Sequence, residues 1–511
     1  MKNLFLITLL IFAINNVLAQ READAMYYGG CYNVAPCACG VPSQGTTYLY
    51  NKDSLVQVID PACLPIRTFY SAACFANKNT GELLFACNGW RLINGDGNIV
   101  SHKLWFDFMP HPQDSPDTST VSTTAGPLFL PHPGDSTKAY LFYGQSENYF
   151  LQNELFSADR FYTYALLDVP TKSIINRNNI LLNDTSSISD MQACRHANGR
   201  DWWLIKPDIW SNKYFIGLLT PQGIEMNNIT LQGVPSDLRV NTSSKFNIQG
   251  TKYIHYNGGL SRVIHEFDFD RCNGTLSNFV LHDISDSISP LDNTLASMNI
   301  SPDGSKFYIQ RNTSQSAGLV QGLFQVDLAT DSMRLIERNG YCPQMTPNGK
   351  NILFPHGTLI APNQWLTRVS EIENPNAHFN DLIIHYFKYT NPNSMKTVAP
   401  NNFAYMRLGA DTLSICDSLS VITKRTKAQE PSGLVVFPNP ASNVLHIEQQ
   451  EQEQVKYKII NYYGQTVQQW QSAEPKQTLY FNNNHLSDGF YLLQATNSKG
   501  IIVQKKFVIQ R

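Results

Sequence analysis

Residues 301–309 read Ser301-Pro302-Asp303-Gly304-Ser305-Lys306-Phe307-Tyr308-Ile309, a turn that ends in glycine and continues as a run of aromatic and aliphatic residues. Proline presets the backbone φ angle, aspartate caps the turn, and glycine takes the positive φ that closes a hairpin. The same pattern returns in residues 346–354 as Thr346-Pro347-Asn348-Gly349-Lys350-Asn351-Ile352-Leu353-Phe354. The two stretches predict two copies of one β-hairpin unit.

Four earlier stretches carry the same turn and strand, with the turn glycines roughly 45 to 65 residues apart along the chain. They are Gly81 before Leu83-Leu84-Phe85, Gly134 before Tyr140-Leu141-Phe142, Gly199 before Trp202-Trp203-Leu204, and Gly250 before Tyr253-Ile254. A second marker is a strand that runs into an aspartate-led turn, at Asp168, Asp268 and Asp327. Repeated four-stranded units of this length are typical of β-propeller blades.

Six copies of the unit are visible, and we expect residues 381–387 to supply a seventh. The sequence therefore predicts an all-β fold, with a seven-bladed β-propeller over residues 40–410 and six or eight blades as alternatives. A stacked array of β-sandwiches is a further alternative, but such an array does not require so regular a spacing of glycine turns.

The composition excludes several classes of protein. Lysine and arginine number 39 against 41 aspartates and glutamates, which gives a net charge of −2 and no basic surplus for binding nucleic acid or an anionic membrane. Hydrophobic residues make up 42% of the chain and aromatic residues 11%, so the chain can bury a large core and is not globally disordered.

The first 19 residues have the three parts of a secretory signal peptide. Lys2 supplies the positive start, residues 4–13 the apolar core, and Ala19 the small residue before the expected cleavage point at Gln20. A short N-terminal membrane anchor is the alternative. No later stretch approaches 18 consecutive apolar residues, so no transmembrane segment is predicted.

The number of cysteines is consistent with an exported protein that contains disulfides. Segment 20–39 is rich in cysteine, and the even total favours disulfides whose connectivity the spacing leaves open. A zinc site at Cys31, Cys37 and Cys39 is the alternative, but no nearby pair completes a tetrahedral ligand set. The ten cysteines are Cys31, Cys37, Cys39, Cys63, Cys74, Cys87, Cys194, Cys272, Cys342 and Cys416.

His196, Arg200 and Asp201, beside the pair Trp202-Trp203, form the richest local cluster and are the candidate binding residues. They could supply a base, a clamp for an anion and a stacking platform. The same residues occupy the turn of the repeat, so a structural role is the alternative. The chain has no Gly-x-Ser-x-Gly, His-Glu-x-x-His or Walker motif. No catalytic residue, metal site or cofactor is predicted.

One acidic stretch, Asn94-x-Asp96-x-Asn98, has the opening of an EF-hand calcium loop. The twelfth position of such a loop would be Trp105, which cannot supply the bidentate carboxylate. A hairpin turn is therefore expected there.

Three strings carry a resemblance beyond the general WD40-like pattern of the turns. They lie at 88–94, 196–203 and 400–409, and together they resemble a group of exported propeller proteins from Bacteroidetes-type bacteria. The resemblance implies the propeller fold and the extracellular compartment. It supplies no catalytic residues.

The composition changes after residue 410. Residues 411–433 form a polar linker, and residues 434–511 contain no cysteine, many glutamines and asparagines, and alternating β patterns. A small β-sandwich is expected over 434–511.

This tail resembles the type A C-terminal sorting domain of the type IX (Por) secretion system. The matching motif residues are Phe437, Pro438, Asn439, Pro440, Gly464, Gly489, Tyr491, Lys505 and Lys506. The resemblance implies recognition by the secretion machinery after folding in the periplasm, cleavage within the linker, and a secreted or outer-cell-surface protein. A generic carbohydrate-binding sandwich is the alternative.

Two functions fit these observations. The first is a non-catalytic propeller that binds a polysaccharide or protein ligand on one face. The second is a hydrolase or lyase acting on extracellular polysaccharide, because paired glycosidase carboxylates need not be close in sequence.

Overall fold

The computed structural model has two units, Met1–Ser420 and Val421–Arg511. It describes residues 25–28, 46–51, 54–59, 73–107, 126–151, 154–186, 191–208, 211–236, 242–257, 263–284, 298–311, 322–338, 340, 343–346, 348–361, 364–390, 408–411, 414, 416, 434–449, 454–461, 465–481, 486–498 and 502–510. The expected signal peptide therefore lies outside the described residues. Within them, no helix has the length and apolar character needed to cross a membrane.

The described part of the first unit consists of antiparallel sheets whose strands follow one another in chain order. Six of these sheets have four strands, and one has three. The four-stranded sheets are β4 (Ala73–Ala76), β5 (Leu83–Cys87), β6 (Leu92–Asn94) and β7 (Ile99–Ser101); β8 (Leu128–Pro131), β9 (Lys138–Leu151), β10 (Glu154–Asp168) and β11 (Ser173–Ser186); β12 (Gln192–Arg195), β13 (Trp202–Pro207), β14 (Lys213–Thr220) and β15 (Gly223–Thr230); β16 (Thr242–Phe246), β17 (Lys252–Asn257), β18 (Val263–Asp270) and β19 (Thr275–Asp283); β20 (Met298–Ile300), β21 (Lys306–Arg311), β22 (Gly322–Asp327) and β23 (Ser332–Arg338); and β24 (Gln344–Met345), β25 (Ile352–Ala361), β26 (Gln364–Ile372) and β27 (Ile384–Thr390). The three-stranded sheet is β1 (Ala25–Tyr28), β2 (Thr46–Asn51) and β3 (Ser54–Ile59), and a 3₁₀ turn, η3 (Phe379–Asp381), precedes β27.

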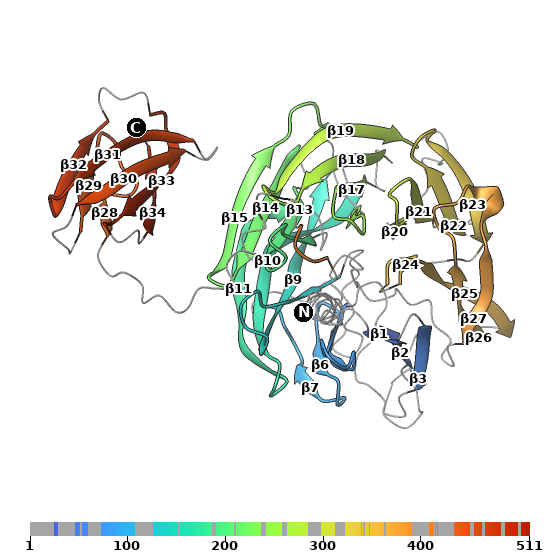
Figure 1. The fold of residues 1–511 in the computed structure, drawn as a ribbon. Coiled ribbons are helices and arrows are strands. Elements are labelled where there is room, and N and C mark those ends of the chain that lie inside the picture. The colour runs from blue at the N-terminus through green and yellow to red at the C-terminus, as the bar shows by residue number, and fades with distance from the viewer. Residues whose placement is uncertain are drawn as a thin grey trace, which may run out of the picture. The chain divides into compact units, whose positions relative to one another are not determined.

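The sheets of this unit follow one another around a common centre (Figure 1). The first strands of neighbouring sheets contact each other, as β4 contacts β8 and β16 contacts β20. The last strands, such as β19 and β23, lie at the outside (Figure 1). Four-stranded antiparallel sheets in this radial arrangement make a β-propeller, which confirms the predicted fold class.

The core lies between the sheets. One buried cluster joins the sheets that begin at β8, β12 and β16, and others join the next sheets along the chain. Burying a large apolar side chain stabilises a fold by about 1.5–3 kcal/mol. The largest fully buried side chains are Trp105, Trp202, Tyr143, Tyr162, Tyr214, Tyr253, Tyr256 and Tyr308. Three of them, Trp202, Tyr253 and Tyr308, belong to the repeat pattern and pack in clusters shared by neighbouring sheets.

The turn glycines connect the first and second strands of their sheets. Five of them have the expected positive φ: Gly81 at 77°, Gly199 at 71°, Gly250 at 67°, Gly304 at 79° and Gly349 at 71°. Gly134 differs, because its φ is not positive. A Cβ at Gly134 would come within 2.8 Å of the Pro221 side chain, so close packing explains glycine at that position.

The expected seventh repeat at 381–387 is wrong. Ile384–Thr390 is β27, the outer strand of the sheet that begins at β24. The additional sheet, β1-β2-β3, lies instead at the N-terminal side of the chain. Its strands carry no Pro-Asp-Gly turn, so the repeat pattern did not find it. The number of blades stays a prediction.

The second unit contains two facing sheets in its described residues, as a small β-sandwich requires. One sheet has the order β28-β29-β32 and the other β31-β30-β33-β34. Their strands are β28 (Val435–Phe437), β29 (Val444–Glu448), β30 (Val455–Asn461), β31 (Thr466–Ser472), β32 (Lys476–Tyr480), β33 (Gly489–Thr496) and β34 (Ile502–Ile509). Alternate residues of β29, β30 and β33 are buried and form one core with Phe507 and Ile509.

Candidate functional site

The predicted cluster at 196–201 forms the turn between β12 and β13. The backbone N–H of Gly199 donates to the His196 carbonyl oxygen at 2.9 Å. The Asn198 side-chain oxygen accepts from the backbone N–H groups of Arg200 and Asp201 at 2.9 and 3.0 Å. The stretch therefore folds as the glycine turn that its repeat pattern predicts.

Arg200 and Asp201 are bonded to each other. Arg200 Nε and Nη2 donate to the two oxygens of Asp201 at 2.7 and 2.9 Å, and this pairing raises the pKa of Arg200. Asn198 Nδ2 also donates to the Asp201 carboxylate at 2.8 Å. Because the Asp201 side chain is 6% exposed, its carboxylate holds the turn together and is not presented to a ligand.

The side chain of His196 also makes its contacts with neighbouring protein residues. Its ring stacks on Trp203 with the centroids 5.5 Å apart, and its Nδ1 accepts from the Asn198 backbone N–H at 2.9 Å. Burial lowers the pKa of His196, although Asp201 and a hydrogen bond to the Cys272 backbone act in the opposite direction. His196 therefore serves as a packing residue of the turn.

The turn docks against the next blade through Arg271, which the sequence did not single out. The Arg271 carbonyl oxygen accepts from the Ala197 backbone N–H at 2.9 Å and from Trp203 Nε1 at 2.8 Å. Gly274, which ends the same β18–β19 turn, leaves room for the Trp203 ring, because a Cβ there would lie 2.5 Å from it. Trp202 lies on the opposite face of β13, fully buried in the core between blades.

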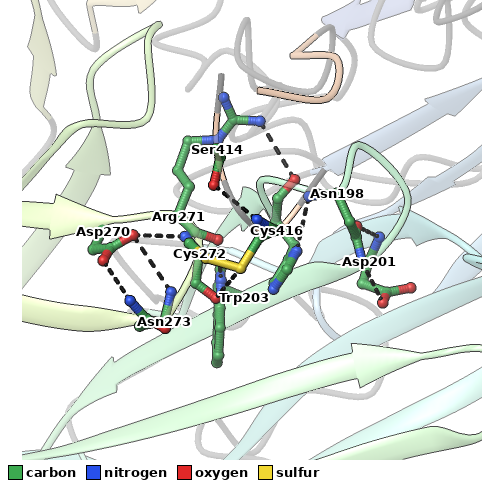
Figure 2. Close-up of a disulfide and its surroundings, with 10 residues drawn as sticks. Asn198, Asp201, Trp203, Asp270, Arg271, Cys272, Asn273, Ser414 and Cys416 are labelled. Atoms are coloured by element: carbon green, nitrogen blue, oxygen red, sulfur yellow. Dashed lines mark hydrogen bonds between the residues drawn. A yellow bond between two sulfur atoms is a disulfide. The ribbon is translucent and has the colours of Figure 1, made fainter. Parts of the chain in front are cut away.

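A disulfide links the β18–β19 turn to a distant part of the chain. Cys272 is bonded to Cys416, 144 residues away, and Figure 2 shows the bond beside Arg271, Trp203 and Asn198. The described residues 408–411, 414 and 416, which we name the strap, lie across the two turns. The Asp411 backbone N–H donates to the Ala197 carbonyl oxygen at 2.8 Å. The predicted linker 411–433 therefore begins with residues that contact the propeller unit.

The disulfide confirms in part the prediction from the cysteine count. Cys87 and Cys194 are free thiols, and burial raises the pKa of each to about 12. Cys31, Cys37, Cys39, Cys63 and Cys342 lie outside the described residues. No group of three or more metal-ligating side chains occurs in the part of the chain that the structure describes. Asn94, from the calcium-like stretch, accepts from the backbone of Asp96 and Asn98 in the β6–β7 turn, as expected for a hairpin.

Arg200 faces a cavity of about 560 Å³, which we name the turn cavity. The cavity is lined by the first turns of three successive sheets, those that begin at β4, β8 and β12. Its charged lining residues are Lys78, Asp135, Lys138, Arg195 and Arg200. Of the residues that line the cavity, only Arg200 belongs to the predicted cluster. The others come from turns distant in the sequence, so no local pattern could have grouped them.

Two of the side chains that line the turn cavity, Arg195 and His132, each pack against an aromatic ring. The Arg195 guanidinium lies 3.7 Å from the centroid of the Trp202 ring, and Arg195 Nη1 donates to the Arg200 carbonyl oxygen at 3.2 Å. His132 stacks on Tyr140 with the centroids 5.4 Å apart, and burial lowers the pKa of His132. Because His132 Nδ1 accepts from the Gly134 N–H at 3.1 Å, a neutral His132 carries its proton on Nε2, which is then a donor.

In the second unit, the motifs from opposite ends of the tail come together. Asn439 Oδ1 accepts from the Val508 backbone N–H at 2.9 Å, and the Ala441 N–H donates to the Val508 carbonyl oxygen at 2.7 Å. Tyr491 stacks on Phe507 at 5.7 Å, and its hydroxyl donates to the Ser487 carbonyl oxygen at 2.8 Å. The sorting motifs from the two ends of the tail therefore contact one another in the folded sandwich.

The remaining motif residues are distributed around these contacts. Phe437 ends β28 and is 42% exposed, and Pro438, Pro440 and Lys505 are exposed. Gly489 begins β33 with a φ of 150°, a conformation that favours glycine. Lys506 belongs to β34, and Gly464 lies outside the described residues.

Solved structures similar to this chain share little sequence with it. A protein from Bacteroides uniformis, crystallised as a candidate 6-phosphogluconolactonase, is 12% identical, with 73% of this chain and 97% of that chain covered and a TM-score of 0.40. A protein from Lactobacillus plantarum is 13% identical over 73% of this chain and 98% of its own, with a TM-score of 0.38. PorZ, a surface component of the type IX secretion system of Porphyromonas gingivalis, is 11% identical over 91% of this chain and 68% of its own, with a TM-score of 0.25. No curated protein matches the chain.

A family model covers the tail. Residues 435–510 match the family described as the secretion system C-terminal sorting domain. This match confirms the sorting tail that the motifs predicted, and with it the route of export. The chain thus ends in a C-terminal sorting domain of the type IX (Por) secretion system, which directs an all-β propeller protein to the cell surface or into the surroundings.

Proposed function

We propose that this protein is a secreted or cell-surface propeller that acts as a non-catalytic binding module after export through its C-terminal sorting domain. Its partners are the type IX secretion machinery, which engages residues 434–511, and a polysaccharide or protein ligand on the propeller. The observation that carries the binding role is the turn cavity, to which three neighbouring blades contribute cationic and aromatic side chains. A cavity of this volume matches the size of ordinary small-ligand sites.

The hydrogen bonds of the 196–201 turn support binding over catalysis at this position. His196 Nδ1 and the Asp201 carboxylate both accept hydrogen bonds from within the turn, so neither is poised as a general base. Arg200 keeps part of its side chain exposed at the cavity while Asp201 fixes its orientation. A cation held in place by its neighbours is suited to recognising a ligand.

The test of this function uses the full chain and a panel of soluble and insoluble polysaccharides. Depletion of the protein from solution and the appearance of new reducing or unsaturated ends are measured together. Depletion without new ends is the expected result and supports a binding module. New ends on any polysaccharide would replace the proposal with the hydrolase or lyase. If the protein is not depleted and no new ends appear, polysaccharide binding is excluded and a protein becomes the expected ligand.

Export is tested separately. Deleting residues 434–511 is expected to leave the protein in the periplasm, whereas the point variant Lys476→Ala, at a side chain that is 76% exposed, should be exported normally. The N-terminus of the exported protein is expected at Gln20. Appearance of the deleted chain outside the cell would overturn the assignment of the export route, and a start at Met1 would overturn the signal peptide.

A further inference from the structure

The lining of the turn cavity is strongly unequal in charge. Four cationic side chains line it, from Lys78, Lys138, Arg195 and Arg200, against the single carboxylate of Asp135. The whole chain, by contrast, carries a net charge of −2. The concentration of cations is therefore a local property of this site and does not follow from the composition.

Two of the cations are partly balanced by carboxylates. Lys138 Nζ lies 2.8 Å from Asp135 Oδ2, and Arg200 is paired with Asp201 behind the lining. Even when Asp201 is counted, cations around the cavity outnumber carboxylates. Lys78 forms no ion pair with any residue in the described part of the chain. The site therefore has an electrostatic preference for an anion.

Two of the cations that line the cavity, Arg195 and Arg200, are also held in position. Asp201 fixes the guanidinium of Arg200 at two points, and the Trp202 ring together with the Arg200 carbonyl fixes Arg195. Guanidinium groups bind carboxylates and sulfates through paired N–H groups, and little entropy is lost when the group is already oriented. His132 adds a neutral Nε2–H donor to the same lining.

We propose that the turn cavity binds the anionic group of an acidic saccharide, a carboxylate or a sulfate ester, through Lys78, Arg195 and Arg200. This inference rests on the proposed binding function and specifies its ligand class. A carboxylate and a sulfate ester both carry one negative charge and present acceptor oxygens. The structure therefore points to an anionic saccharide, and the experiment distinguishes a carboxylated from a sulfated one. Attraction at a partly exposed site weakens with ionic strength, so binding of either source should weaken as salt is added.

The experiment measures binding of the full chain to polygalacturonate, dextran sulfate and neutral dextran by calorimetry at low and high salt. The expected result is salt-sensitive binding of at least one acidic polymer and none of dextran. Lys78→Glu should weaken that binding by about tenfold or more, because it reverses a charge at the site. Lys78→Arg should retain the binding. Lys350→Glu is the matched control, since Lys350 lies in the equivalent turn of another sheet and does not line the cavity.

Three results would overturn the inference. Binding of neither acidic polymer is the first, and equal loss in Lys78→Glu and Lys350→Glu is the second. Binding of dextran as tightly as the acidic polymers is the third, and it would leave the proposed binding function standing while removing its acidic ligand. Melting temperatures of the two glutamate variants within a degree or so of the parent would show that folding is not the cause.

Discussion

Arg271 Nη2 donates a hydrogen bond of 2.7 Å to the carbonyl oxygen of Gly409, 138 residues further along the chain. Arg271 Nε donates in addition to the Arg195 carbonyl oxygen at 2.9 Å. One guanidinium thus joins its own turn, the turn of the preceding blade and the strap. The strap also packs tightly on that turn, because a Cβ at Gly199 would lie 2.5 Å from the Ala410 nitrogen.

Arg271→Ala should destabilise the propeller unit by about 1.5–3 kcal/mol, the usual range for hydrogen bonds from a charged donor. Arg271→Lys should recover little of this loss, because one ammonium cannot reach carbonyl oxygens on both sides. Urea-induced unfolding followed by tryptophan fluorescence measures the change. Arg160→Ala is the control, since Arg160 pairs with Glu147 at an exposed position and lies 5.3 Å from the centroid of the Phe161 ring, and its loss should cost no more than about 1 kcal/mol. Equal effects of Arg271→Ala and Arg160→Ala would contradict the role of Arg271.

The disulfide beside Arg271 should contribute separately to stability. Cys272→Ser, Cys416→Ser and the double variant should each lose about 2–4 kcal/mol, because the bond closes a long loop in the unfolded chain. A reducing agent should bring the parent protein to the same stability as the variants. A parent protein that keeps its urea midpoint on full reduction would refute the stabilising role.

Thiol labelling provides the control for this experiment. The thiols of Cys87 and Cys194 are buried with raised pKa values, so they should stay unlabelled in the native protein at neutral pH. After reduction, new labelling should appear at Cys272 and Cys416, because both residues are partly exposed. Labelling of Cys194 before any at these two positions would contradict the assignment.

The sequence predicts this fold where the determinants are local. The positive φ of Gly304 and its equivalents follows from a four-residue turn pattern, and the strands after those turns have the expected aromatic residues. The tail motifs are likewise short, and they proved to be hydrogen-bonded to one another across the sandwich. The sheet β1-β2-β3 lacks that turn and was therefore missed.

The candidate site was predictable only in part, because its contacts are long-range. Arg200 could be identified from its cluster, but its cavity also needs Lys78 and His132 from two other blades. Likewise, the sequence shows that Cys272 and Cys416 exist without showing that they meet. Spacing along the chain carries no information about such pairs until the blades are placed around the ring.

A buried ion pair joins the sheet that begins at β8 to the sheet that begins at β12. Lys206 Nζ of β13 lies 3.1 Å from Asp159 Oδ2 of β10, and both side chains are fully buried. Lys206→Met should cost about 3–5 kcal/mol, because it removes the Lys206 cation from a buried carboxylate that the Ser146 hydroxyl bonds at 2.7 Å but does not neutralise. The double variant Lys206→Met with Asp159→Asn should recover part of the loss. Urea midpoints measure both, and a double variant less stable than Lys206→Met would contradict the pairing.

His282 makes the stability of the blade contact depend on pH. Its Nε2 lies 3.2 Å from Glu266 of the same sheet and its Nδ1 2.6 Å from Asp331 of the next sheet. Burial lowers the pKa of His282, but the hydrogen bonds to Glu266 and Asp331 outweigh it, so the pKa is raised above 6.5. The hydrogen bond from His282 in turn lowers the pKa of Glu266 below 4.5.

The signs of the two shifts define the pH window. A raised pKa means that the His282 contribution is complete below pH 6.5 and is lost as the pH rises through the pKa of the folded state. The Glu266 contribution is complete above pH 4.5 and is lost as the pH falls through its own lowered pKa. His282→Gln should therefore be less stable than the parent at pH 6, with a smaller difference at pH 9. Melting temperatures over this range test the point, with His385→Gln as the control for an exposed pair. A difference that grows from pH 6 to pH 9 would contradict the assignment.

The last prediction concerns the joint between the tail motifs. Asn439→Ala removes the oxygen that accepts from the Val508 N–H, so it should destabilise the second unit by about 1 kcal/mol. If the secretion machinery recognises the assembled motifs, the same variant should accumulate in the periplasm. Asn439→Asp keeps an acceptor oxygen at the same position and should be exported close to the parent level. The fraction of protein outside the cell, measured by immunoblotting of medium, surface and periplasm, decides the matter. Normal export of Asn439→Ala would show that recognition reads individual motifs and does not require this hydrogen bond between them.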